Sequence, residues 1–294
     1  MLGKLIKHDF NSLSRVLFPT KIAVLGATIL ATIGFAINFR MGYSNGNNGL
    51  IGLLRLLTGF MSGIMVLAII AASILVAFII FQRFYKNLMC SEGYLTFTLP
   101  VTTAEILWSK LITAMLWTII SSVVVFISIN IFVLFGTGEN AFMNTEAYRE
   151  MGKFFHVAFS TIGGRLVWPI LEITLFVIVS AVSSILHVYL ALIIGGIVSQ
   201  KHKILASIGF YFVINIAVSI LSTILSYFLG TNMVVTAESF NGMHWDTQDA
   251  LSLYNQIFGA VQPYYWTFLV FSVAVCAAYF ILSHYFLKSK LNLE

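Results

Sequence analysis

Apolar residues in this chain form six long runs that are separated by more polar stretches. The runs cover residues 21–39, 58–81, 111–135, 166–194, 204–229 and 264–287. A helix of about 20 apolar residues is long enough to cross a bilayer. The pattern therefore predicts an all-α membrane protein with six transmembrane helices, forming a single transmembrane domain over residues 1–294.

Residues 1–18 precede the first run and have an amphipathic pattern instead. On a helical wheel of about 100° per residue, their apolar side chains share one arc of roughly 140°. This arc holds Leu2, Leu5, Ile6, Phe10, Leu13, Val16 and Leu17. Asp9 is an exception, because it falls inside the apolar arc. A basic amphipathic helix of this kind lies in the membrane interface, and packing against a soluble partner is the alternative. Pro19 is expected to end the helix, which separates 1–18 from a six-span bundle over 19–294.

The polar stretch between the second and third runs contains a helix start signal. Its sequence over residues 91–110 is SEGYLTFTLPVTTAEILWSK. Thr102 and Glu105 have the spacing of a capping box, which predicts a helix that begins near Thr103. Pro100 stands just before this point, as expected outside a helix start. The third span is therefore expected to begin outside the bilayer and to enter it near Trp108 and Lys110.

The first half of the same stretch is unusually apolar. Four of its side chains are too apolar for a loop that faces only water, namely Tyr94, Leu95, Phe97 and Leu99. The segment is also too short to cross a membrane. An apolar patch rimmed by polar groups marks a contact site for a partner. The alternative is that these side chains fold back onto the helix ends of the chain itself, and the residues alone leave both open.

Composition supports the membrane prediction and charge sets an orientation. The chain is 59% hydrophobic and 9% charged, whereas soluble domains carry about 25% charged residues. With both termini inside, the inner segments hold eleven Lys and Arg residues and the outer segments hold five. The positive-inside rule favours that orientation in the cell membrane. It also explains the formal charge of +5 without a nucleic-acid partner. Residues 1–18 are too polar for the apolar core of a cleavable signal peptide.

Motifs for catalysis, metal binding or cofactor binding are missing from the sequence. It contains no P-loop, no His-Glu-x-x-His and no Gly-x-Ser-x-Gly, so neither ATP nor a metal is expected to bind this chain. His187 and His284 are expected to be hydrogen-bonded core or interface residues. Glu172 is the one acid inside a predicted span and lies about two helical turns from Arg165. Pairing with Arg165 or extension to water is one explanation, and a polar site on a pathway or subunit interface is the other.

The stretch SEGYLTFTLPVTTAEILWSKL resembles a segment of ABC-2-type transporter permeases from Gram-positive bacteria. In that family an EGYLT-like stretch, a TLP turn and a following Ser-Lys pair stand between spans two and three. The N-terminal helix, the six spans and the GGIVSQKHK junction between spans four and five are similar in layout.

The resemblance implies a coupling helix between spans two and three that docks on a separate ATPase subunit. The docking surface would comprise Glu92, Gly93, Tyr94, Leu95, Phe97, Thr98, Leu99 and Pro100. ATP and Mg²⁺ would then bind the partner ATPase, and a second permease chain, identical or similar, would complete the path. The expected function is export of amphipathic or apolar substrates, with peptides favoured. The alternatives are a secondary transporter, or a membrane sensor or assembly protein without transport.

Overall fold

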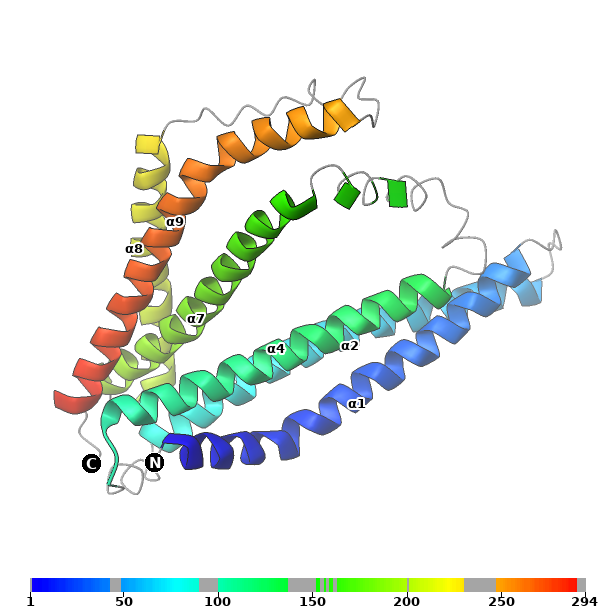
Figure 1. The fold of residues 1–294 in the computed structure, drawn as a ribbon. Helices are drawn as coiled ribbons and strands as arrows, with labels where there is room; N and C mark the ends of the chain where they lie inside the picture. Colours follow the sequence, from blue (N-terminus) through cyan, green and yellow to red (C-terminus); the bar gives the residue numbers. More distant parts are fainter. Residues whose placement is uncertain are drawn as a thin grey trace. The chain divides into compact units, whose positions relative to one another are not determined.

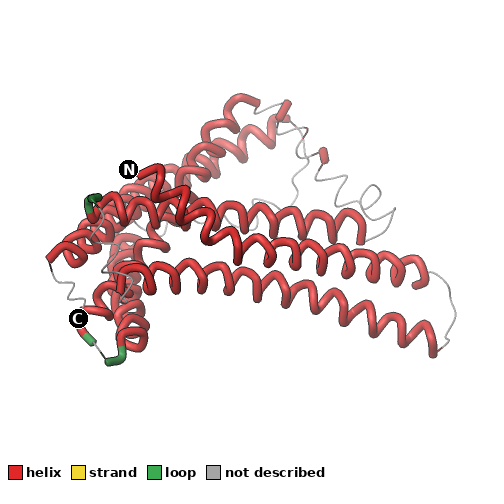
Figure 2. Tube along the Cα trace, turned by 90° about the horizontal axis from the view of Figure 1, so that it is seen from below, coloured by secondary structure: helices red, strands yellow, loops and turns green. Residues whose placement is uncertain are grey.

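Every regular element in the described part of the chain is helical. The computed structural model describes residues 2–42, 49–89, 100–136, 152–153, 156, 159–160, 163–199, 201–229 and 247–289. The elements are α1 (Leu2–Gly42), α2 (Gly49–Met89), α4 (Thr103–Gly136), the 3-10 helix η2 (Gly163–Leu166), α7 (Val167–Val198), α8 (Lys203–Leu229) and α9 (Thr247–Ser289). Figure 2 shows how little of the described chain lies in loops.

Six of these helices are long and apolar enough to cross a membrane. The qualifying segments are Leu2–Ala36, Gly59–Met89, Thr103–Phe132, Gly163–Val198, Lys203–Leu229 and Val261–Lys288. Each contains most or all of one predicted apolar run, so the six predicted spans are confirmed as helices of that length and character. Many of their large apolar side chains point outward, as expected of helices that face lipid. Phe228 is 81% exposed and Phe60 is 72% exposed.

The expected helix end at Pro19 is wrong. A single helix, α1, runs for 41 residues from Leu2 to Gly42 with Pro19 inside it. Proline removes one backbone hydrogen bond and commonly kinks a helix, but long membrane helices tolerate it where the neighbouring structure is stable. Figure 1 shows that the dark blue start of α1 runs in a different direction from the rest. Pro19 therefore lies in a continuous helix and does not separate two of them.

The chain forms two compact units. Unit 1 comprises Met1–Arg83 and Trp108–Glu150, and unit 2 comprises Phe84–Leu107 and Met151–Glu294. Consequently α1 belongs to unit 1, whereas α7, α8 and α9 belong to unit 2. Two helices contribute residues to both units: α2 passes from unit 1 to unit 2 after Arg83, and α4 passes from unit 2 to unit 1 after Leu107.

In unit 1 the apolar arc of the N-terminal segment packs on α4. The rings of Phe10 and Trp117 stack with centroids 5.0 Å apart. Leu13 and Leu17 are buried, with 5% and 0% exposure. This arc is therefore covered at least in part by the chain's own third span. Further along α1, the ring of Phe35 lies 5.4 Å from that of Phe132.

In unit 2, α7 packs against both α8 and α9 (Figure 1). The core of this unit includes Leu186, Leu190 and Ile193, all at most 2% exposed. α7 and α8 approach closely at Gly195, where an added Cβ would collide with the backbone and hydroxyl of Ser207. A residue without a side chain is therefore needed there, which explains one glycine of the Gly-Gly pair in the junction motif.

Candidate functional site

Most of the predicted docking surface lies outside the described residues. This applies to Glu92, Gly93, Tyr94, Leu95, Phe97, Thr98 and Leu99. Pro100 is described and is exposed. The helices on either side of the segment, α2 and α4, are described, and their contacts show how the two ends of the segment are held.

The downstream flank begins with the predicted capping box. The backbone N–H of Thr102 donates to Glu105 Oε2 at 2.9 Å. In return, the N–H of Glu105 donates to Thr102 Oγ1 at 3.2 Å. This reciprocal pair satisfies two N–H groups that a helix start otherwise leaves unpaired. The predicted start of a helix near Thr103 is therefore confirmed, since α4 begins at Thr103.

The first turn of α4 is also anchored within unit 2. Thr103 Oγ1 and His284 Nδ1 lie 3.1 Å apart, which joins the start of α4 to the last turns of α9. Ile106 and Leu107 follow and are buried, with 2% and 0% exposure. His284, which was expected to be a hydrogen-bonded core or interface residue, is thus one of the groups that hold the start of α4.

The upstream flank is the C-terminal end of α2, and it packs on α7 and α8. The ring of Phe84 stacks on Tyr189 with centroids 3.7 Å apart and planes 8° from parallel. Leu88 is fully buried. The ammonium of Lys203 donates to the carbonyl oxygen of Met89 at 3.2 Å. Both ends of the segment between α2 and α4 are therefore fixed to the helices of unit 2.

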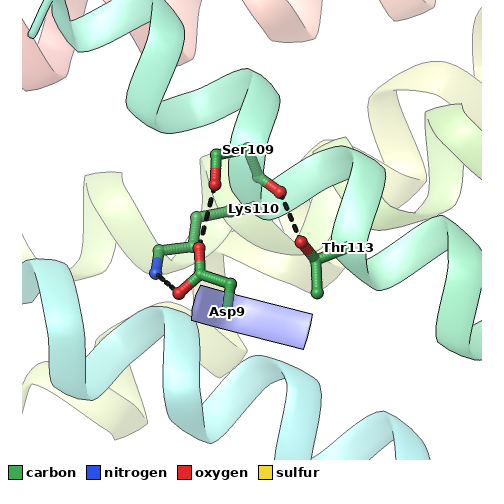
Figure 3. A network of polar contacts seen from close by, with 4 residues as sticks. All are labelled: Asp9, Ser109, Lys110 and Thr113. Carbon is green, nitrogen blue, oxygen red and sulfur yellow. Dashed lines mark hydrogen bonds and ion pairs between the residues drawn. The ribbon is translucent and has the colours of Figure 1, made fainter. Parts of the chain in front are cut away.

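A cluster of polar side chains lies in unit 1 around Asp9 (Figure 3). Lys110 Nζ lies 2.6 Å from Asp9 Oδ1, and Ser109 Oγ donates to Asp9 Oδ2 at 2.9 Å. Thr113 Oγ1 donates to the carbonyl oxygen of Ser109 at 2.8 Å. Asp9 is 5% exposed, and Ser109 and Thr113 are each 1% exposed. Both carboxylate oxygens of Asp9 are thus satisfied, one by a cation and one by a hydroxyl.

Sequence reasoning missed this cluster, although the signal for it was present. Asp9 is the one residue that interrupts the apolar arc of the N-terminal segment. That arc packs on α4, so an acid within it meets α4 at Ser109 and Lys110. These two residues are the Ser-Lys pair of the sequence motif. A buried acid requires such a partner, because an unpaired buried charge is strongly unfavourable.

A second cation adds to the positive charge near Lys110. The charge of Arg83 at the end of the unit 1 part of α2 acts repulsively on Lys110. Arg83 Nε is buried without a hydrogen-bond partner. Since Asp9 carries the negative charge of this cluster, its loss would remove the ion pair that it forms with Lys110 at 2.6 Å, while the repulsion from Arg83 would persist.

Another cluster of polar side chains surrounds Glu172 of α7 in unit 2. Gln262 Nε2 of α9 donates to Glu172 Oε1 at 2.9 Å. Tyr265 Oη donates to the backbone carbonyl oxygen of Glu172 at 2.7 Å. Trp266 Nε1 donates to Gln262 Oε1 at 2.7 Å and so orients the amide. Glu172 is 7% exposed. The chain of hydrogen bonds therefore joins the first turns of α7 to the start of the apolar segment Val261–Lys288 of α9.

The described hydrogen bond of the Glu172 side chain is with Gln262, and the pairing with Arg165 stays a prediction. Arg165 lies in η2 and its side chain is exposed. The carboxylate accepts its hydrogen bond from the neutral amide of Gln262. The side chain of Glu172 is buried among the helices of unit 2. Gln262 stands one residue before Pro263 in a weakly hydrophobic stretch, so nothing in its sequence context identified it as a partner.

His187 is a core residue of unit 2. Its ring stacks on Tyr211 at 4.5 Å and on Tyr279 at 5.3 Å. Its Nε2 lies 3.2 Å from the carbonyl oxygen of Tyr211. This confirms the expected hydrogen-bonded core role. Among the described residues, no group of three or more His, Cys, Asp or Glu side chains is arranged to hold a metal ion.

Comparison of the chain with protein-family models, with curated proteins and with solved structures finds no match.

Proposed function

We propose that this chain is the membrane subunit of an ATP-driven exporter of the ABC-2 type, with ATP hydrolysis on a separate partner subunit. The proposal rests on the segment between α2 and α4, whose sequence resembles the coupling segment of that class. ATP and Mg²⁺ belong to the partner, and Tyr94, Leu95 and Phe97 are the buried anchors of the docking surface. Aromatic and large apolar anchors carry most of the binding energy in such interfaces.

The observation that carries the proposal is the fixation of both ends of this segment. A coupling element must transmit force, so its ends must be held by the helices that it moves. The upstream end is held by the contacts of Phe84 and Met89 with α7 and α8. The downstream end is held by the capping box and by the contact between Thr103 and His284. A free linker would need neither anchor.

The connectivity also suits a coupling role. Because α2 and α4 each contribute residues to both units, a displacement of the segment between them acts on both units through continuous helices. We infer that ATP-driven closure of two partner subunits moves two such segments in a dimer of permease chains. Alternating access of a path between the chains would follow.

The basic face of residues 1–18 lies in the inner membrane interface, and both termini are cytoplasmic, as the distribution of Lys and Arg favours. The described spans are largely apolar, and the substrate class proposed is amphipathic or apolar, with peptides favoured. A similar or identical second chain completes the path.

Truncation of two anchors tests the proposed function. Loss of a buried interface anchor commonly costs about 2 kcal/mol, or about thirtyfold in affinity. Tyr94→Ala combined with Phe97→Ala should therefore remove most of the vanadate-sensitive ATPase activity that co-purifies with the tagged chain from its native membranes. Expression and detergent stability should stay near wild type.

A matched control is the adjacent aromatic pair Tyr227 and Phe228 of α8, which are 83% and 81% exposed. Tyr227→Ala combined with Phe228→Ala removes the same kinds of ring and should leave the co-purified ATPase unchanged. Full ATPase recovery with the Tyr94 and Phe97 double variant would refute docking at this segment. It would then favour the fold-back alternative for these apolar side chains.

A further inference from the structure

An open pocket lies in unit 2 at the start of α8, and no step of the proposed export mechanism uses it. Its volume is about 570 Å³. The lining consists of the two residues before α8, the first turns of α8 and Tyr85 of α2. One part of this lining is basic and another part is apolar.

The basic part comprises Lys201, His202 and Lys203. Lys201 and His202 are exposed. The first helical hydrogen bond here runs from the N–H of Ala206 to the carbonyl of His202, so the N–H groups just before Ala206 add partial positive charge. The sequence has no Asp or Glu over residues 173–237, nor over α2. The segments that line the pocket therefore supply no acid to neutralise its positive charge.

The apolar part comprises Ile204, Leu205 and Ile208, which are 59%, 70% and 49% exposed. These residues belong to the helical segment Lys203–Leu229, which is apolar enough to cross a membrane. The pocket thus lies at one end of a span, where the polar and hydrocarbon zones of a bilayer meet. Positive charge stands at the very end of the span, and exposed apolar surface follows directly.

We propose that this pocket binds the phosphate-bearing headgroup of an anionic phospholipid, with an acyl chain lying along the exposed apolar side chains of α8. Basic pockets at the cytoplasmic ends of transmembrane helices take anionic headgroups, and that leaflet carries the anionic lipids. The distribution of Lys and Arg assigns the start of α8 to the same side. A free phosphate would bind to the basic residues of the pocket, but it would make no contact that explains the exposed apolar side chain of Leu205.

Native mass spectrometry of the detergent-purified full chain tests the inference with dioleoyl phosphatidylglycerol and dioleoyl phosphatidylcholine as probes. The wild type should retain the anionic lipid preferentially. One basic group near a charged lipid surface contributes about 1 kcal/mol, or about fivefold in affinity. Lys201→Gln combined with His202→Gln should therefore weaken phosphatidylglycerol binding by about fivefold and leave phosphatidylcholine binding unchanged. Neither residue is buried, so the fold should persist.

Lys153 and His156 provide a matched control, because they are an exposed lysine and an exposed histidine of unit 2 outside the lining of the pocket. Lys153→Gln combined with His156→Gln should leave the preference intact. An equal loss with this control pair would reduce the effect to general surface charge and overturn the proposal. Inorganic phosphate at millimolar concentration should not displace the lipid, and full displacement would assign the pocket to a free anion instead. The test uses the purified chain alone. A negative result would therefore refute lipid binding at this pocket and would say nothing about the ATPase partner.

Discussion

Among the described residues, unit 1 buries the carboxylate of Asp9 and unit 2 buries that of Glu172, and the two carboxylates are satisfied in different ways. Asp9 in unit 1 receives an ammonium group at 2.6 Å and a hydroxyl at 2.9 Å. Glu172 in unit 2 receives a neutral amide at 2.9 Å. Their exposures are nearly equal, at 5% and 7%. The difference shows that burial alone does not determine what an acid contributes, because the charge of its partner decides what is lost on substitution.

The Asp9 cluster depends on the negative charge itself. Removing one member of a buried ion pair leaves the other charge uncompensated, which typically costs 3–5 kcal/mol. The Glu172 cluster depends on an acceptor oxygen, which a neutral side chain of the same shape also provides. A typical neutral hydrogen bond contributes only about 1 kcal/mol. Replacing each acid with its amide therefore tests the comparison directly.

Asp9→Asn is expected to have the largest effect. The amide keeps the shape of the side chain but removes the negative charge that lies 2.6 Å from the Lys110 ammonium, while Arg83 still repels Lys110. The free energy of unfolding in mixed detergent micelles should fall by about 3 kcal/mol. Chemical denaturation of the purified protein measures this change.

A second variant distinguishes the ion pair from general packing damage. Asp9→Leu combined with Lys110→Met removes both charges and keeps apolar bulk, which often restores stability after loss of a buried pair. Ser109 can then donate to a carbonyl in the preceding turn of α4. The double variant should be more stable than Asp9→Asn. If the double variant is the less stable of the two, the charge of Asp9 is not what the site requires.

The sequence predicted the six spans and the start of α4, because both depend on local patterns. Length and hydropathy determine a span, and the capping box of Thr102 and Glu105 acts within one turn. The partners of the buried acids were not predictable in the same way. Asp9 and Lys110 are 101 residues apart and Glu172 and Gln262 are 90 apart, so each pairing depends on how helices pack. Pro19 was misjudged for a related reason, since its strong local preference against helix is outweighed by the stability of a long membrane helix.

Glu172→Gln is expected to have a much smaller effect than Asp9→Asn. The glutamine carbonyl can accept the hydrogen bond from Gln262, and the hydroxyl of Tyr265 is bound to the backbone of residue 172 and is not lost. The free energy of unfolding should fall by less than about 1 kcal/mol. Export should remain near wild type if this acid only joins α7 to α9. A severe loss of export with normal expression and assembly would instead show that Glu172 works in the transport path.

Double-mutant cycles should show the smallest coupling between Glu172 and Arg165. The carboxylate of Glu172 is bound to Gln262 of α9, whereas the side chain of Arg165 is exposed. Residues that do not contact one another usually show additive effects within about 0.5 kcal/mol. The cycle of Glu172→Ala with Arg165→Gln should therefore give a coupling energy below about 0.5 kcal/mol in chemical denaturation. The parallel cycle of Glu172→Ala with Gln262→Leu should give a larger one, because each single change removes one partner of the hydrogen bond between the two side chains. If the Arg165 cycle gave the larger coupling, Glu172 would be part of an ion pair, and the contrast with Asp9 would disappear.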